Sequence, residues 1–385
     1  MFADDIFVAL SDPEQSLPPL LTLLTDYGGI SYYRLPINLP GPTVNTLKTS
    51  FELDWRTTSI TYLGVKIATP ISNVVKLNYK PLIQLCTTDV HKWKNAKLSW
   101  LGRVNAYKMM LLPRLLYIFR MLTIDIQAVI YKSLQAICNS YIWGGKKPRL
   151  PLSFLQRTTN MGGIGLPNIG LYYKASILAT SIHLHAQQGV TQWVDMEQDQ
   201  LSQTSLLNYM WTPRTLRGPK MSLYPTTTAT IKVWDDFMSS FGWKKHFHPE
   251  APLNALHAVN PTIPLARWSH LGISQIQQLC REQSIMSFPD IRDKWGVPVR
   301  DIFPYLQLKN AINTHVKNTP STMPTTTVAA RLIPHRCWAA LTKPKALSLC
   351  YKAWLELTPR KPLACKQNWE NERRKELTDD EWMKP

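Results

Sequence analysis

The chain has 385 residues and a formal net charge of +18 at pH 7. Its apolar content of 44% and its 14 tryptophans are typical of a globular protein and exclude a disordered chain. The six cysteines form no C-x-x-C pair, and the sequence shows neither a signal-peptide pattern nor an apolar run of bilayer length. We therefore expect an intracellular protein of the cytoplasm or nucleus, without a membrane partner or a disulfide-linked partner.

The positive charge is concentrated in one part of the sequence. Residues 76–157 contain 14 Lys or Arg but only two acidic residues, Asp89 and Asp125, whereas residues 1–75 contain four basic and seven acidic ones. A block with this charge indicates binding to a phosphate backbone. The alternative is an ordinary solvated surface.

The first five residues end in two adjacent carboxylates, Asp4 and Asp5, followed by an apolar run at residues 6–10. This pattern suits the tip of a β-hairpin, where both carboxylates can coordinate a divalent metal. Mg²⁺ prefers such hard oxygen ligands, completed by water and substrate phosphate. Taken alone, however, the pattern more often marks a polar turn.

The rest of residues 1–75 predicts short strands and one helix, at roughly residues 17–26. A Pro/Gly cluster at residues 36–42 marks a loop. Residues 60–67, with the sequence ITYLGVKI, predict a hairpin.

From residue 78 onward the apolar residues recur with a helical period, and three helices are expected to form a bundle. The first carries the stripe Leu82, Cys86, Val90 and Trp93. The second, over residues 99–122, should bury Leu101, Val104, Leu111, Leu115, Ile118 and Leu122. The third should bury Ile126, Ile130, Leu134, Ile137 and Tyr141. Pro113 lacks a backbone N–H, so it should kink the second helix.

Two groups of basic residues in this block are candidates for nucleic-acid binding. Arg103, Tyr107 and Arg114 share one helical face with Met110, and this mixture of cations and an aromatic ring suits a nucleic-acid backbone. The alternative is two surface arginines beside a half-buried tyrosine. A flexible loop after the third helix carries the second group: Lys146, Lys147 and Arg149.

Residues 162–167 are Gly-rich but match neither a P-loop nor a dinucleotide fingerprint, so we expect a closely packed turn before a helix at residues 169–185. The histidine pairs 183/185 and 246/248 have positions that do not favour metal binding. Residues 212–230 and 318–327 are rich in Pro and Thr and predict loops. Residues 268–313 predict a helical segment, and a charged tail begins at residue 366.

Short motifs spread along almost the whole chain match one known family. They are Phe2-Ala3-Asp4-Asp5, Tyr62-Leu63-Gly64-Val65, Asn78-Tyr79, Trp93, Leu98 to Arg103 (LSWLGR), Leu112 to Tyr117 (LPRLLY), Tyr141-Ile142-Trp143, Gly162-Gly163 with Leu166-Pro167-Asn168 and Tyr172-Tyr173, Phe303 with Tyr305 to Leu308 (YLQL), Trp369-Glu370 and Glu381-Trp382. Each motif is a common short sequence, but their order and spacing are specific. By these motifs the chain resembles the reverse transcriptase of LINE-type non-LTR retrotransposons, over the C-terminal half of the second open reading frame.

The resemblance implies an RNA-directed DNA polymerase in which Asp4 and Asp5 bind Mg²⁺ at the catalytic site, with an RNA template and a DNA primer as partners. It also implies nucleic-acid contacts at Tyr62 and Gly64. The family's third carboxylate comes from an upstream palm strand, Pro36 replaces its lysine after the hairpin, and its terminal Cys/His knuckle is missing. We therefore expect the chain to be unable to polymerise alone. The alternatives are a non-enzymatic nucleic-acid-binding helical module and an incomplete gene model of a full, active reverse transcriptase.

The expected fold is mainly α, with a truncated α/β palm remnant at the N-terminus, a helical thumb bundle and a largely helical C-terminal region. Five parts are expected: the C-terminal remnant of the palm (1–75), the helical thumb (76–145), a basic Gly/Pro loop and helix (146–187), a partly looped connector (188–264), and a helical C-terminal region with a charged tail (265–385). Because truncation of the palm sheet leaves strand edges unpaired, residues 1–75 should be marginally stable alone.

Overall fold

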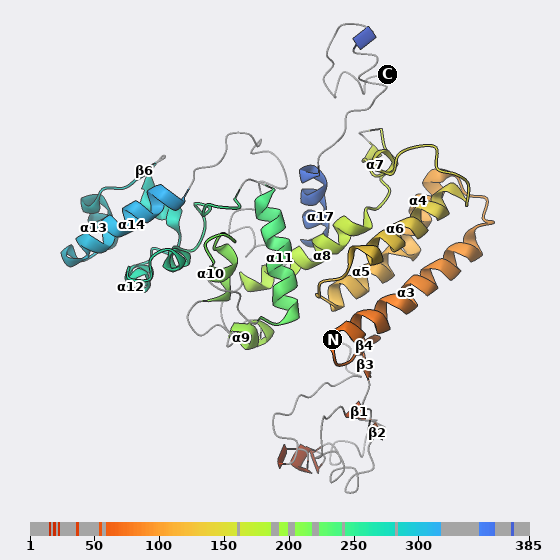
Figure 1. The fold of residues 1–385 in the computed structure, drawn as a ribbon, viewed down its shortest axis with the longest axis horizontal. Helices are drawn as coiled ribbons and strands as arrows, with labels where there is room; N and C mark the ends of the chain where they lie inside the picture. The colour runs from red at the N-terminus through yellow and green to blue at the C-terminus, as the bar shows by residue number, and fades with distance from the viewer. Residues whose placement is uncertain are drawn as a thin grey trace. The chain divides into compact units, whose positions relative to one another are not determined.

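The structure is a computed structural model of the chain (Figure 1). It describes residues 15–16, 18–20, 22–23, 36–37, 54–55, 59–159, 162–185, 192–198, 205–217, 223–240, 243–281, 284–316, 346–358 and 371–372. Within these residues the chain is mainly helical, and its strands pair only two by two. The chain divides into two compact units, Met1–Ala96 and Lys97–Pro385, called unit 1 and unit 2 below. The described residues identify neither a palm nor a thumb.

The clearest element of unit 1 is the β-hairpin of β3 (Ile60–Tyr62) and β4 (Val65–Ile67), which confirms the hairpin predicted at residues 60–67. Tyr62 pairs with Val65, so the loop contains only Leu63 and Gly64. Both have positive φ, 46° and 73°, as a type I′ turn requires. A second pair joins β1 (Pro36–Ile37) to β2 (Asp54–Trp55) in parallel, so the loop predicted at residues 36–42 begins in a short strand.

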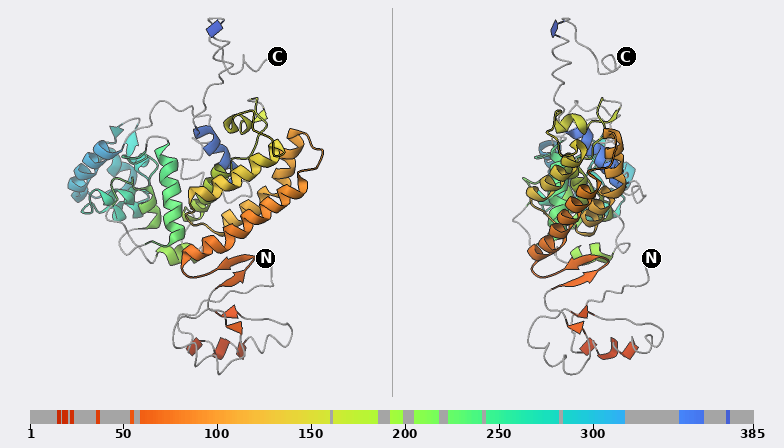
Figure 2. Two further views of the ribbon diagram at one scale, coloured as in Figure 1. Left: turned by 45° about the vertical axis from the view of Figure 1, so that its right-hand side comes forward. Right: turned by 90° about the vertical axis from the view of Figure 1, so that its right-hand side faces the viewer.

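The hairpin runs directly into α3 (Ile71–Trp93), which Figure 2 shows beside it. Asn78 joins the two elements, because its side-chain Oδ1 accepts from the Lys66 N–H at 2.9 Å while its Nδ2 donates to the Lys66 carbonyl at 2.7 Å. The amide thus pairs with β4 as a neighbouring strand would. The helix starts before the expected residue 78 and crosses the expected 75/76 boundary. Of the predicted stripe, Leu82 and Cys86 are buried, while Val90 and Trp93 are half-buried.

Unit 2 begins with three helices: α4 (Trp100–Met110), α5 (Leu112–Met121) and α6 (Ala128–Trp143). The predicted kink is a local interruption at Leu111, which keeps helical φ and ψ and still bonds to the Tyr107 carbonyl at 3.0 Å, and Pro113 lies in the first turn of α5, where its missing N–H costs nothing. Five of the residues expected to be buried in this region are buried: Val104, Leu111, Leu115, Ile118 and Leu122. The prediction that Leu101 is buried is wrong, since its exposed fraction is 54%. In α6, Leu134 and Tyr141 are buried, as is Ile126 before it, and Ile130 and Ile137 are half-buried.

The central helix of unit 2 is α8 (Ile169–Leu184), which confirms the helix predicted at residues 169–185. It packs against α5, α6, α11 (Pro225–Ser239) and α17 (Ala346–Leu357) (Figure 1). Tyr173 fixes α8 to the α5–α6 connection: its hydroxyl donates to the Ile124 carbonyl at 2.8 Å and accepts from the Ile126 N–H at 3.1 Å. Tyr351 of α17 stacks on Tyr172 with ring centroids 3.7 Å apart.

The Gly-rich segment between α7 (Leu152–Leu155) and α8 is a closely packed turn, as predicted. A Cβ on Gly163 would lie 2.2 Å from the Arg157 carbonyl oxygen, a distance that no side chain tolerates. The Gly165 N–H donates to the same carbonyl at 2.8 Å. The glycines therefore serve backbone packing rather than phosphate binding.

The loop predicted at residues 212–230 is correct in its first part, since residues 212–217 lie outside any helix, and wrong at its end. Helix α11 begins at Pro225, inside the Pro/Thr-rich stretch 212–230. Proline is favourable in the first turn of a helix, and the apolar residues Trp234 and Phe237 further along α11 are buried in the core. The remaining elements are α9 (Gln192–Gln198), α10 (Leu206–Trp211), η2 (Leu253–Ala258), α12 (Leu265–His270), η3 (Ile276–Leu279), β5 (Cys280–Arg281), β6 (Ser284–Ile285), α13 (Phe288–Trp295), η4 (Val299–Asp301) and α14 (Ile302–His315). No helix among the described residues combines the length and apolarity needed to cross a bilayer.

Candidate nucleic-acid interface

The predicted metal ligands, Asp4 and Asp5, lie outside the described residues. In the described part of the chain, no group of three or more His, Cys, Asp or Glu side chains is placed to hold a metal ion. Tyr62 is half-buried at the end of β3, and Gly64 is exposed in the hairpin turn of unit 1. The other predicted contact residues all lie in unit 2.

The predicted face of Arg103, Tyr107 and Arg114 does not form one surface. Tyr107 is only 1% exposed, so its ring cannot stack on a base, and we exclude it from the interface. It lies in the core beside Cys138, whose thiol pKa is raised to about 12 by burial. Tyr107 follows Val104 by three residues and precedes Leu111 by four, and because both of these are buried, Tyr107 lies on the same core face.

The contacts of Arg103 stabilise the fold and do not indicate a ligand-binding role. Its Nη1 donates to the Tyr141 carbonyl at 2.8 Å, and its guanidinium carbon lies 5.6 Å from the centre of the Tyr141 ring. Tyr141 is in the last turn of α6, where unpaired carbonyls and the negative end of the helix dipole both favour a cation. Gly144 ends that helix with φ of +60°, and a Cβ there would lie 3.1 Å from Arg103 Nη1.

The neighbouring residues of the LSWLGR motif also have structural roles. The Ser99 side chain caps α4 by accepting from the Gly102 N–H at 3.1 Å. The Trp100 ring meets the Trp143 ring of α6 edge to face, with centroids 4.8 Å apart and an interplanar angle of 72°. The residues of this motif and of the Tyr141–Trp143 motif are therefore in contact with each other.

Helix α5 does present cations and an aromatic ring to solvent. Arg114, Tyr117 and Arg120 are spaced at i, i+3 and i+6, all three are exposed, and Tyr117 is 44% exposed. We call these three residues the α5 face. Tyr117 and Arg120 were not predicted as contact residues, because Arg114 was grouped with Arg103 and Tyr107 before it rather than with the residues after it. The signal was present, since the apolar residues Leu111, Leu115 and Ile118 mark the buried side of the helix and leave the other side to the polar residues.

A second exposed basic group follows α6, as predicted. Lys146, Lys147 and Arg149 are exposed, and none has an acidic partner in the described part of the chain. Gly144 and Gly145 begin this segment with φ of +60° and +78°, which turns the chain sharply away from α6. We call residues 144–149 the basic loop.

The stretch of sequence that carries both groups is almost without acidic residues. Residues 97–157 contain ten Lys or Arg and a single acidic residue, Asp125, which pairs with Lys232 of α11 at 2.5 Å. Lys108 is partly buried, which lowers its pKa, so it contributes less to the outer surface than the exposed cations. The arrangement suits a polyanion, because basic residues outnumber acidic ones ten to one in this stretch of sequence.

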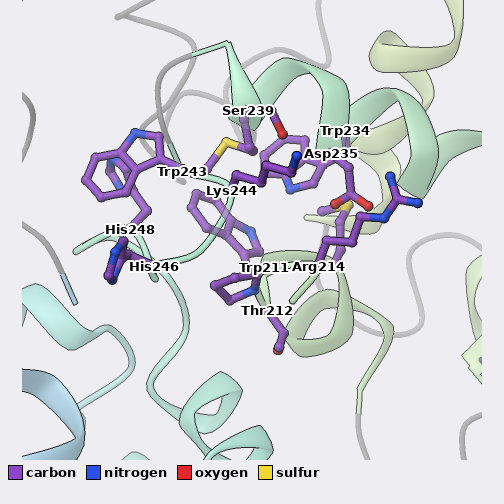
Figure 3. Close-up of a pocket in the computed structure, with 13 residues that line it drawn as sticks. Trp211, Thr212, Arg214, Trp234, Asp235, Ser239, Trp243, Lys244, His246 and His248 are labelled. Atoms are coloured by element: carbon purple, nitrogen blue, oxygen red, sulfur yellow. The ribbon is translucent and has the colours of Figure 1, made fainter. Parts of the chain in front are cut away.

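A small pocket elsewhere in unit 2 is the other candidate site (Figure 3). Trp211 and Trp234 line it, with Arg214 and Lys244 among the polar residues around them. Its free volume is about 20 Å³, which is room for water and not for a nucleotide. Burial lowers the pKa of His248 to about 4, so this histidine is neutral and accepts from the Glu250 N–H at 3.0 Å.

His185 shows that the aromatic cluster around this pocket is a core. Its Nδ1 lies 2.7 Å from the Ser181 carbonyl, and its Nε2 accepts from Trp211 Nε1 at 3.0 Å. The imidazole therefore links α8 to α10 with both ring nitrogens in use. Arg217 and Asp235 form a partly buried two-pronged ion pair, with N–O distances of 2.7 and 2.8 Å. These contacts stabilise the fold, and we assign them no ligand.

A comparison of the chain with models of known protein families finds no match. The resemblance to reverse transcriptases thus remains a prediction that rests on the motif residues.

Proposed function

We propose that the chain is the C-terminal part of a reverse transcriptase of a LINE-type non-LTR retrotransposon, and that unit 2 binds a nucleic-acid backbone through the α5 face. The observation that carries the binding proposal is the exposed series Arg114, Tyr117 and Arg120 in a segment with a single acidic residue. Arginine side chains bind phosphates, and an exposed tyrosine between them can pack against a sugar of the same backbone.

Contacts between motif residues support the ancestry part of the proposal. Asn78 of one motif pairs with β4, which begins at Val65 of another, and Arg103 of a third bonds to Tyr141 of a fourth. Motifs that are distant in sequence but joined in space are what a common structural framework would produce. Under this proposal, residues 1–75 correspond to part of a palm and residues 76–145 to a thumb.

The catalytic part of the proposal depends on Asp4 and Asp5. As Mg²⁺ ligands they would supply the carboxylate oxygens that the metal prefers. Because both lie outside the described residues, no step of the binding proposal runs through the metal. The α5 face would serve equally a nucleic-acid-binding module without polymerase activity, so a binding experiment tests what the two functions share.

The experiment measures binding of a fluorescein-labelled RNA–DNA hybrid by fluorescence anisotropy at one moderate salt concentration. The double variant Arg114→Ala/Arg120→Ala should bind about tenfold more weakly than the unchanged chain, because two phosphate contacts are lost. The charge-matched control is Arg300→Ala/Lys309→Ala, since both residues are exposed elsewhere in unit 2. Equal loss in the two variants would show a general charge effect and reject the α5 face.

A further inference from the structure

Trp100 is an exposed aromatic residue beside the basic loop. It lies in the first turn of α4 and is 44% exposed. Its partner Trp143 is only 6% exposed, so one indole of the edge-to-face pair is anchored in the core while the other reaches solvent. The ring of Trp100 is therefore held in place from one side, and part of its surface is free to meet a ligand.

The basic loop starts from the same place. The Trp143 carbonyl accepts from the Lys146 N–H at 3.1 Å, so the first cation of the loop follows within one turn of the indole that Trp100 touches. The Gly145 N–H donates back to the Ser140 carbonyl at 3.0 Å, and Arg103 packs against Gly144. These contacts fix the base of the loop next to α4, while Lys147 and Arg149 remain exposed.

An aromatic surface beside several uncompensated cations fits one ligand chemistry. An unpaired nucleobase can stack on an indole, and the adjoining phosphates can contact the cations. A duplex cannot use the indole in this way, because its bases already stack on one another.

We propose that Trp100 and the basic loop form a binding site for single-stranded nucleic acid, with other residues than the α5 face. The site rests on the proposed function only in that both require unit 2 to bind nucleic acid. The predicted division is that Trp100 serves an unpaired strand, whereas Arg114 and Arg120 serve a paired backbone.

The test measures the affinity of the full chain for labelled oligo(U) and for the labelled RNA–DNA hybrid. Trp100→Ala should weaken binding of oligo(U) about tenfold and leave hybrid binding within about twofold. Trp100→Phe keeps an aromatic surface and should retain most of the affinity, whereas Trp100→Leu keeps an apolar contact with Trp143 and should not. The matched control is Tyr224→Ala, since Tyr224 is also 44% exposed and lies at the start of α11. Thermal melts of all variants check that they remain folded.

The outcomes separate this inference from the proposed function. If Trp100→Ala binds oligo(U) like the unchanged chain, or if Trp100→Leu is as good as Trp100→Phe, the stacking site is overturned while the α5 face can still be supported by its own variants. If the α5 variants leave hybrid binding intact but Trp100→Ala weakens oligo(U) binding, the α5 face is rejected and the stacking site is supported.

Competition with poly-glutamate tests whether the site instead binds an acidic protein partner. If the same concentration of poly-glutamate displaces oligo(U) from the unchanged chain and from Trp100→Ala, the stacking site is overturned.

Discussion

Helices α4 and α5 are adjacent, and each carries arginine and tyrosine at helical spacing, yet they use these residues in opposite ways. In α4, Tyr107 is buried and Arg103 bonds to the end of α6. In α5, Arg114 and Tyr117 are exposed. The comparison shows that a cation and an aromatic ring on one predicted face do not by themselves indicate a binding surface. What separates the two helices is which face the neighbouring helices cover.

The largest expected difference concerns the two tyrosines. Tyr107→Ala should lower the free energy of unfolding of unit 2 by about 4 kcal/mol, because it leaves a cavity in the core. Tyr117→Ala should change it by less than about 0.5 kcal/mol, because the side chain is exposed. Urea denaturation followed by circular dichroism measures both values. Similar losses in the two variants would break the contrast between α4 and α5.

The arginines should differ in the same direction but by less. Arg103→Ala removes a charge-assisted hydrogen bond and a cation from the C-terminus of α6, and we expect a loss of about 2 kcal/mol. Arg114→Ala should cost less than about 0.5 kcal/mol. The readout is the midpoint of thermal unfolding for each variant. If Arg103→Ala and the unchanged chain have the same midpoint of thermal unfolding, Arg103 does not cap α6 and is again a candidate for nucleic-acid contact.

The smallest expected difference between a variant and its control tests the packing of Arg103 against the end of α6. Gly144→Ala forces a side chain into the left-handed region and into Arg103, so we expect a loss of about 2 kcal/mol. The matched control is Gly296→Ala at the end of α13, where φ is +69° and no atom lies within 4 Å of the added Cβ. The control should lose only the backbone part, about 1 kcal/mol. Equal losses, measured by urea denaturation, would mean that Arg103 simply moves aside.

The sequence predicted the positions of the main helices and of the hairpin, because apolar periodicity and turn residues are local signals. It placed α8 within one residue of its observed end, and it interpreted residues 162–167 correctly as a packed turn. It failed where the outcome depends on tertiary contacts. The exposure of Leu101 could not be read from its spacing, and the start of α11 at Pro225 was hidden by threonines that are common in loops.

The candidate interface was predictable in composition but not in detail. The concentration of positive charge predicted a candidate interface within residues 97–157, and the exposed cations of the basic loop were identified from sequence alone. The exchange of Tyr107 for Tyr117 required knowing which side of α4 and α5 the neighbouring helices cover, since Tyr107 shares the buried side with Val104 and Leu111. The role of Arg103 required its partner Tyr141, 38 residues further along the chain.

The most direct test of the central claim, that the α5 face contacts phosphates, is the salt dependence of hybrid binding. The logarithm of the association constant is measured against the logarithm of KCl concentration for the unchanged chain and for Arg114→Ala/Arg120→Ala. Because each phosphate contact contributes about 0.9 to the slope on B-form DNA, the double variant should show a slope smaller in magnitude by roughly 2. An unchanged slope in this folded variant would contradict the account.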